Sequence, residues 1–184
     1  MKPELRDQIV KHAFETEEKL RISIMVGVAF PAIIEKLIRD DLGGTIIGAM
    51  GNTWLCSVVM SGMRFTLSLR SRSWPEGLWV GLQDREEGAT HLFAVWRPDN
   101  HQQRAVLDER LHRALCQALP ETRPQPAGGA YPWWGFLDRY RSWSPEEFLL
   151  ALAGKGVRKD LEDWLLRLCK AAAEAIDQDA IASS

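Results

Sequence analysis

The stretch MRFTLSLRSRSWPEGLWVGLQ, residues 63–83, decides the fold of this chain. Over its first eight residues, apolar side chains alternate with Arg, Thr and Ser, which predicts a strand with one buried and one wet face. The turn formers SWPEG follow at 73–77, and a second apolar run comes directly after them. A connection this short joins antiparallel strands, because a parallel crossover needs about a dozen residues. The stretch therefore predicts an antiparallel hairpin.

Outward from this hairpin, strand-length apolar runs recur with turn formers between them. The turn formers are of the kind that joins neighbouring antiparallel strands. Five such runs are present, at residues 45–50, 53–60, 63–70, 77–83 and 90–97. The sequence therefore predicts an antiparallel meander of four or five strands.

Helical patterns flank the predicted sheet on both sides. Residues 4–21 have helical spacing, and Pro31 is suited to open a second helix that Gly43–Gly44 would stop. After the predicted sheet in the sequence, apolar stripes predict a helix over 105–119 and a last helix along 161–176. Between these two helices, SPEE at 144–147 has the form of a capping box that begins a further helix, and residues 121–132 read as a loop.

Together these patterns predict an α+β fold, with N-terminal helices, an antiparallel four- to five-stranded meander, and C-terminal helices packed on one face of the sheet. The length of 184 residues fits a single domain. We expect that domain to span residues 1–177, with a helical part at 1–42, the sheet at 43–97, a second helical part at 98–177, and a tail at 178–184.

Charge and cysteine content restrict the classes of function. The formal net charge of -2 gives no overall attraction to nucleic acid or to anionic membranes. The most apolar window, residues 22–30, is too short to span a bilayer and is closed by Pro31, so we expect no membrane association and no signal peptide. Cys56, Cys116 and Cys169 are far apart and odd in number, which argues against a disulfide framework and favours a cytoplasmic location.

No motif for catalysis, metal binding or a cofactor is present. The sequence has no HExxH, CxxC, GxSxG or GxGxxG pattern and no Walker loop. His112 and Cys116 have the spacing of two zinc ligands on one helix, but the sequence shows no further ligands for them. We therefore expect no catalytic residue, no metal and no cofactor. A divergent enzyme that uses His91 or Asp84 in a cleft is the alternative.

The stretch YPWWGFLDRYRSW, residues 131–143, concentrates five aromatic side chains among arginines. Trp143 directly precedes the capping box and is placed to pack on Phe148 as a hydrophobic staple, which is a structural role. Trp133 and Trp134 are adjacent, so we expect one of them to be at least partly exposed. The other cationic stretch, residues 64–74, holds three arginines and no acid.

These two stretches supply the candidate residues for binding a partner. Arginine with interleaved Trp and Tyr is typical of contact surfaces, although strand arginines also line the wet face of many sheets. The candidates are Trp133, Trp134, Arg139, Tyr140, Arg141, Arg64, Arg70, Arg72 and Trp74.

Two longer stretches carry a resemblance to a known family. FTLSLRSRSWPEGLWVGLQDREEGATHLFAVWRPDN at 65–100 combines strands with a Trp-Pro turn, and residues 131–177 combine a Trp-Trp turn with two helices. This order resembles the C-terminal region of bacterial proteins of the PD-(D/E)XK nuclease superfamily, over roughly residues 1–177. The resemblance implies Mg²⁺ held by an acidic residue and a (D/E)-x-K pair on neighbouring strands.

The catalytic pattern of that superfamily is absent from the predicted sheet. All lysines lie at or before Lys36 or at or after Lys155, and the only (D/E)-x-K triplet, at 17–19, is on the first helix. Because the strands from 45 to 82 contain no Asp or Glu, Mg²⁺ would have few oxygens to hold it. The resemblance is therefore to the non-catalytic part of such proteins, and no catalytic residue carries over.

From these observations we hypothesise a non-catalytic, macromolecule-binding protein of a bacterium or phage, such as an immunity, inhibitor or defence-associated factor. Another protein is the expected partner, because Trp, Tyr and Arg are enriched at binding hot spots. A nucleic-acid-binding module is the main alternative, since arginines and aromatics also suit phosphate and stacking contacts. A homo-oligomer is compatible with both hypotheses.

Overall fold

The computed structural model describes residues 8, 15–62, 64–84, 90–97, 105–125, 130–140, 148, 151–152 and 155–182 of the chain. Its helices are α2 (Glu17–Lys36), the π-helix η1 (Leu37–Gly43), α3 (Gly44–Met50), α4 (Ala105–Ala118), the 3-10 helix η2 (Asp138–Tyr140) and α6 (Lys155–Ala182). Its strands are β1 (Trp54–Ser61), β2 (Arg64–Ser71), β3 (Leu78–Asp84), β4 (Thr90–Trp96), β5 (Arg123–Gln125) and β6 (Trp133–Phe136).

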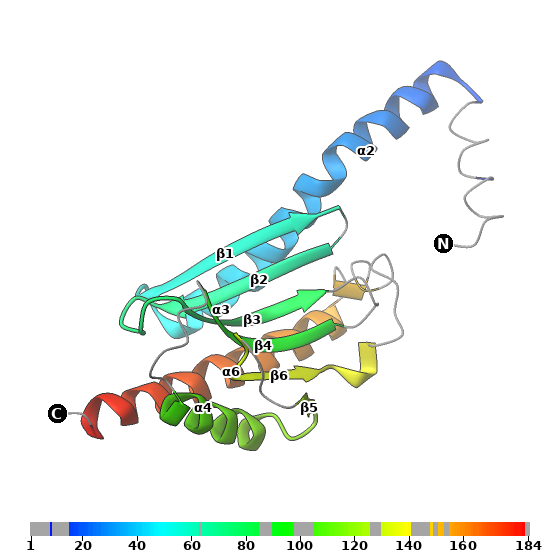
Figure 1. Cartoon of the computed structure of the whole chain (residues 1–184). Coiled ribbons are helices and arrows are strands. Elements are labelled where there is room, and N and C mark those ends of the chain that lie inside the picture. Colours follow the sequence, from blue (N-terminus) through cyan, green and yellow to red (C-terminus); the bar gives the residue numbers. More distant parts are fainter. Residues whose placement is uncertain are drawn as a thin grey trace.

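Within the described part of the chain, six strands form one antiparallel sheet in the order β1-β2-β3-β4-β6-β5 (Figure 1). β1 to β4 follow one another as the meander that the alternating apolar runs predicted. The helices α4 and α6 lie on the two predicted apolar stripes. The α+β class is confirmed, and the sheet has more strands than the four or five expected.

The additional strands come from the segment between α4 and α6. β5 lies inside residues 121–132, which read as a loop, and β6 lies inside the aromatic stretch. Both are very short, so neither shows a clear alternation in the sequence. β6 is defined by its partner: Trp133 pairs with Ala94 and Trp134 pairs with Phe93 of β4. Such pairing between distant segments leaves little local signal.

The N-terminal helices differ from the expected ones. Residues 45–50 belong to α3 and are not a strand, and Pro31 lies inside α2 instead of opening a helix. A short apolar run is ambiguous between a strand and a buried helix, which explains the first error. Gly43 is the last residue of η1 but does not stop the helical backbone, because its φ of -62° is helical and α3 begins directly after it. A Cβ at Gly43 would lie 2.7 Å from the Cys56 Sγ, so this glycine permits close packing of η1 on β1.

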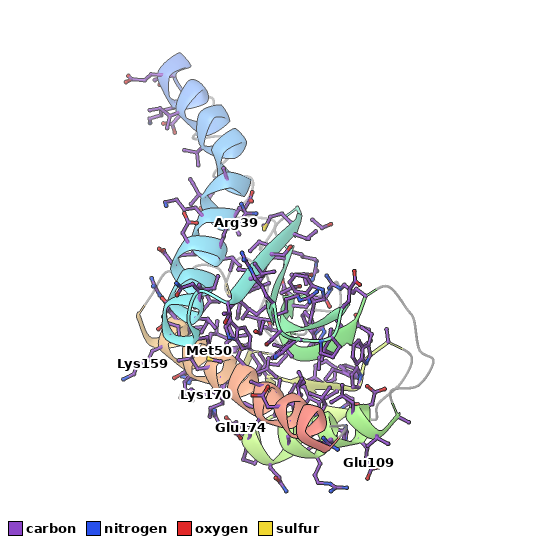
Figure 2. The ribbon with its side chains drawn as sticks, turned by 90° about the vertical axis from the view of Figure 1, so that its left-hand side faces the viewer. Arg39, Met50, Glu109, Lys159, Lys170 and Glu174 are labelled. Atoms are coloured by element: carbon purple, nitrogen blue, oxygen red, sulfur yellow. The ribbon has the colours of Figure 1, made fainter. Side chains whose placement is uncertain are left out.

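One face of the sheet, the core face, carries the apolar rows that the strand registers align. Leu67, Leu82 and Leu92 face one another across β2, β3 and β4 and are fully buried. The helix α6 lies behind the sheet in Figure 1. In the side view of Figure 2, Lys159 and Lys170 lie on the outer side of α6, away from the sheet. The helical layer therefore covers one face of the sheet, as expected, and α6 continues to Ala182, into the expected tail.

Two contacts show how the chain after the meander is fixed to the core face. The Trp96 indole Nε1 donates a hydrogen bond of 2.8 Å to Asp108 Oδ1 on α4. The Phe148 ring stacks on Phe65 of β2, with ring centroids 5.9 Å apart. These residues come from both halves of the chain, so the sheet and the helices share one hydrophobic core.

The close packing of β2 against β3 gives a stability prediction. A Cβ on Gly81 would lie 1.9 Å from the Leu67 carbonyl oxygen and 3.0 Å from Phe93 Cζ. We expect Gly81→Ala to lower the free energy of unfolding by about 3 kcal/mol, because backbone atoms of a sheet cannot move aside without strain. Urea unfolding followed by Trp fluorescence measures this change.

Gly48→Ala is the matched control, because nothing lies within 4 Å of a Cβ at that position of α3. We expect this variant to match the wild type or to gain about 0.5–1 kcal/mol. Equal stability of the two variants would contradict the close approach of β2 and β3.

Candidate partner-binding face

The second face of the sheet is formed by the residues that alternate with those of the core face. Its arginines and aromatic side chains lie on neighbouring strands because of the registers of β2 to β6. We call this set the arginine–aromatic face; it comprises Arg64, Arg70, Trp79, Phe93, Arg97, Arg123, Trp134 and Phe136. No described strand residue of this face is acidic.

Two of the arginines are held by the rings beside them. The Arg70 guanidinium lies 5.4 Å from the centroid of the Trp79 ring, and that of Arg97 lies 5.9 Å from Phe93. Arg70 also donates a hydrogen bond of 3.2 Å from Nη2 to the Trp74 carbonyl oxygen. A guanidinium over an aromatic face gains cation–π attraction. These contacts fix the orientation of the Arg70 side chain.

A cluster of rings continues the face toward β6. Trp134 and Phe136 pack edge to face, with centroids 5.1 Å apart. His91 lies beneath them, 5.8 Å from Trp134 and 6.2 Å from Phe136, and is 1% exposed. Trp134 and Phe136 are themselves only half-buried. Part of each ring is therefore exposed, next to the buried His91 on which both rings pack.

The arginines of the face differ from those of the helices in their charge partners. Arg113 on α4, for example, lies 2.8 Å from Glu109, and its side chain is 69% exposed. By contrast, Arg70, Arg97 and Arg123 make no ion pair with an acid in the described part of the chain. Among the described residues, therefore, no acid neutralises the charge of these three arginines at short range.

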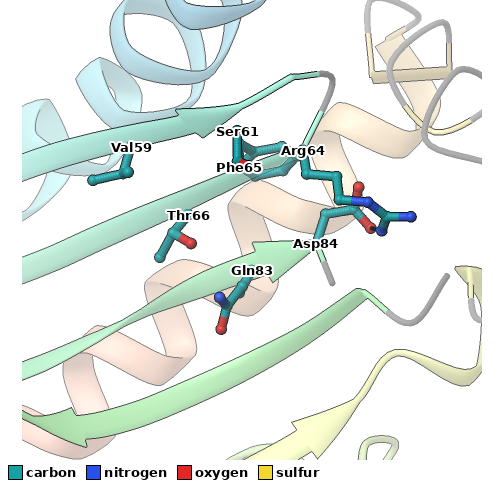
Figure 3. A pocket seen from close by; sticks show the side chains of 7 residues that line it. All are labelled: Val59, Ser61, Arg64, Phe65, Thr66, Gln83 and Asp84. Atoms are coloured by element: carbon teal, nitrogen blue, oxygen red, sulfur yellow. Dashed lines mark ion pairs between the residues drawn. The ribbon is translucent and has the colours of Figure 1, made fainter. Parts of the chain in front are cut away.

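A pocket of about 190 Å³ lies at the end of this face, where β1, β2 and β3 come together. Figure 3 shows Arg64 and Asp84 side by side at the strand ends. Their closest nitrogen and oxygen atoms are 3.9 Å apart. Burial raises the pKa of Asp84, and the charge of Arg64 opposes that shift. The lining residues are Val59, Ser61, Arg64, Phe65, Thr66, Gln83 and Asp84.

Three of the nine candidate contact residues are buried in the core. Trp133 and Tyr140 are fully buried, and Trp74 is 4% exposed and packs against Trp54. The Tyr140 hydroxyl donates a hydrogen bond to Asp160, and burial raises its pKa to about 12. Because these three side chains are buried, another molecule cannot reach them. Their large apolar rings fill the hydrophobic core.

The structure brings Arg64, Arg70 and Trp134 together on the arginine–aromatic face. Arg72 is exposed in the turn after β2. Arg139 is exposed as well, but it pairs with Asp160 of α6.

Other expectations lie on residues that the structure does not describe. Arg141, the staple residue Trp143 and the capping box at 144–147 lie outside the described residues.

Five residues of the face were not among the sequence candidates: Trp79, Phe93, Arg97, Arg123 and Phe136. Trp79 alternates with the buried Leu78 and Val80, which is a signal in the sequence itself. The other four depend on the pairing of β4, β6 and β5, for which the sequence gives no register, and Phe93 is 1% exposed.

Known proteins give no further guidance. The chain matches no family model, no curated protein and no solved structure.

The described residues also bear on metal, thiol and membrane roles. No cluster of three or more His, Cys, Asp or Glu side chains that could hold a metal ion is found in this part of the chain. His112 and Cys116 do meet, with Nε2 and Sγ 3.6 Å apart. Burial raises the pKa of both Cys56 and Cys169, so neither thiol is activated as a nucleophile. No described helix combines the length and apolar character needed to cross a bilayer.

The raised pKa of Asp84 gives a pH-dependent prediction. Because the folded state raises this pKa above its ordinary value of 3.8, ionising the carboxyl costs stability as the pH rises through the folded pKa. Asp84→Asn removes this titration. We therefore expect the free energy of unfolding of the variant, relative to the wild type, to increase as the pH rises above the ordinary pKa of 3.8. Urea unfolding at several pH values measures it.

The exposed Asp138→Asn is the control for the loss of one carboxylate at the surface. A relative stability of Asp84→Asn that falls with rising pH would show that the pairing with Arg64 outweighs the burial of the carboxylate.

Proposed function

We propose that this protein is a non-catalytic binding protein that holds a macromolecular partner on its arginine–aromatic face. The observation that carries the proposal is the separation of charge. Helix arginines such as Arg113 pair with acids, whereas Arg70, Arg97 and Arg123 form no ion pair with any acid whose position the structure describes. A surface with unneutralised arginines beside half-buried rings suits a partner that is acidic and partly apolar.

An acidic protein surface is the partner that we favour. Hot spots of protein interfaces are enriched in Trp and Arg, and they work best when their side chains are ordered beforehand. Arg70 meets this condition, because Trp79 and the Trp74 carbonyl oxygen hold its guanidinium. A factor that acts by occupying a partner, such as an inhibitor or an immunity protein, needs no catalytic group. The three unpaired thiols fit a cytoplasmic setting.

Single-stranded nucleic acid is the second candidate. Trp79, Trp134 and Phe136 are half-buried on the same sheet face, and exposed ring faces or edges contact bases in many such complexes. The arginines beside them would then contact phosphates. This candidate predicts an affinity that falls steeply with rising salt, because bound cations are released from the strand.

A capture experiment tests the proposal. The wild type, Arg70→Glu and Trp134→Ala are each used to retain partners from native lysate, with and without nuclease treatment. We expect both variants to retain at least about tenfold less of the partner, since each removes a central contact. Arg113→Glu is the matched charge reversal on the helical side and should behave as the wild type.

The same experiment distinguishes a protein partner from a nucleic-acid partner. Capture that survives nuclease and depends on Arg70 supports the protein partner. Nuclease-sensitive capture, together with salt-dependent binding of an oligothymidylate in fluorescence anisotropy, supports nucleic acid. Capture that is equal for the wild type and both face variants contradicts the proposed function.

A further inference from the structure

The two edges of the sheet are protected very differently. β5, at one edge, has only three residues, and Arg123 and Pro124 are among them. β1, at the other edge, has eight residues, WLCSVVMS, without a charge, a proline or a glycine. Short length, charge and proline are the usual devices that prevent an edge strand from pairing with another chain. β1 has none of them.

The outward backbone groups of β1 follow from its pairing with β2. The Arg72 amide donates a hydrogen bond of 2.9 Å to the Thr53 carbonyl oxygen, so this pair is a hydrogen-bonded one. Along an antiparallel ladder such pairs recur at every second residue. The backbone amides and carbonyls of Cys56, Val58 and Met60 therefore point away from β2, in the plane of the sheet, at its free edge. No hydrogen bond between described residues involves them. Backbone donors and acceptors in such a regular row find hydrogen-bond partners most readily in another β-strand.

We propose that the occupant of this edge is a second copy of the chain, whose β1 pairs antiparallel with the first about a twofold axis at Val58. The inference goes beyond the proposed function, because it concerns self-association and not the partner. Val58 then faces its own counterpart, which is the geometry of a self-complementary interface. On the second face of the sheet, Ser57 of one copy lies opposite Val59 of the other, so no like charges meet.

A second feature on the same side of the molecule fits this arrangement. α2 leaves the body beside β1 and projects beyond it, in both Figure 1 and Figure 2. Ile22, Val26 and Ile33 lie on one side of this helix and are 53%, 53% and 56% exposed. Solitary exposed apolar residues are normal, but a row of them next to an unprotected edge marks a surface that associates. The joined sheet would also place two arginine–aromatic faces in one assembly.

A pair of double variants tests the register. Ser57→Lys with Val59→Lys puts lysine opposite lysine twice across the axis, whereas Ser57→Glu with Val59→Lys puts opposite charges there. Val59 is 57% exposed, so both variants should fold, which thermal unfolding checks. We expect a dimeric wild type, a rise of about tenfold or more in the dissociation constant with two lysines, and recovery with the Glu–Lys pair. Sedimentation over a range of concentrations gives the masses.

Residue-resolved amide exchange adds a second readout that needs no substitution. The amides of Cys56, Val58 and Met60 should become protected as the protein concentration rises, while those of Ser57 and Val59 stay protected throughout.

Three results overturn the inference: a wild type that is monomeric at every concentration, a dimer that both double variants leave intact, or a dimer that only Ile22→Lys with Val26→Lys disrupts. The last result would assign the interface to α2. All of these measurements use the purified chain without a partner, so they stand apart from the test of the proposed function.

Discussion

The row formed by Leu67, Leu82 and Leu92 is the constraint on which the rest of the structure depends. These three residues align across β2, β3 and β4, and burying them selects which face of the sheet the helices cover. Since side chains alternate along a strand, a slip of one residue would exchange the two faces. The same register that builds the core therefore sends Arg70 and Trp79 to the opposite face. Core and candidate binding face are two results of one pairing pattern.

The second face accommodates arginines because guanidinium groups on it lie over aromatic rings. The Arg70 guanidinium over Trp79 illustrates this arrangement: the ring covers one side of the cation, and the Trp74 carbonyl accepts one of its hydrogen bonds. Lysine would not make the same planar contact, since its ammonium group is a compact, strongly hydrated charge. The use of arginine alone on the described strands is thus consistent with cations ordered by stacking.

The sequence predicted the meander and the helices α4 and α6, because alternation and apolar stripes are local signals. The predictions from sequence were wrong or incomplete where contacts between distant parts of the chain determine the local structure. Residues 45–50 form a helix, and Gly43 accommodates the Cys56 thiol across the chain. The aromatic stretch shows the same limit. One of Trp133 and Trp134 was expected to be at least partly exposed, and Trp134 is half-buried whereas Trp133 is fully buried. The register of β6 on β4 determines which of the two tryptophans is buried in the core.

The distribution of charge explains why the net charge of -2 says little about this molecule. Many acidic residues lie on the helices and form ion pairs with helix arginines, such as Glu109 with Arg113 and Glu162 with Arg158. Such pairs cancel at short range and contribute little to the field on the opposite side of the sheet. The local potential at the second face is set by Arg70, Arg97 and Arg123, which make no ion pair with an acid in the described part of the chain, whereas Arg64 lies beside Asp84. A weakly acidic protein can therefore present a cationic face, because the sheet separates the two populations of charge.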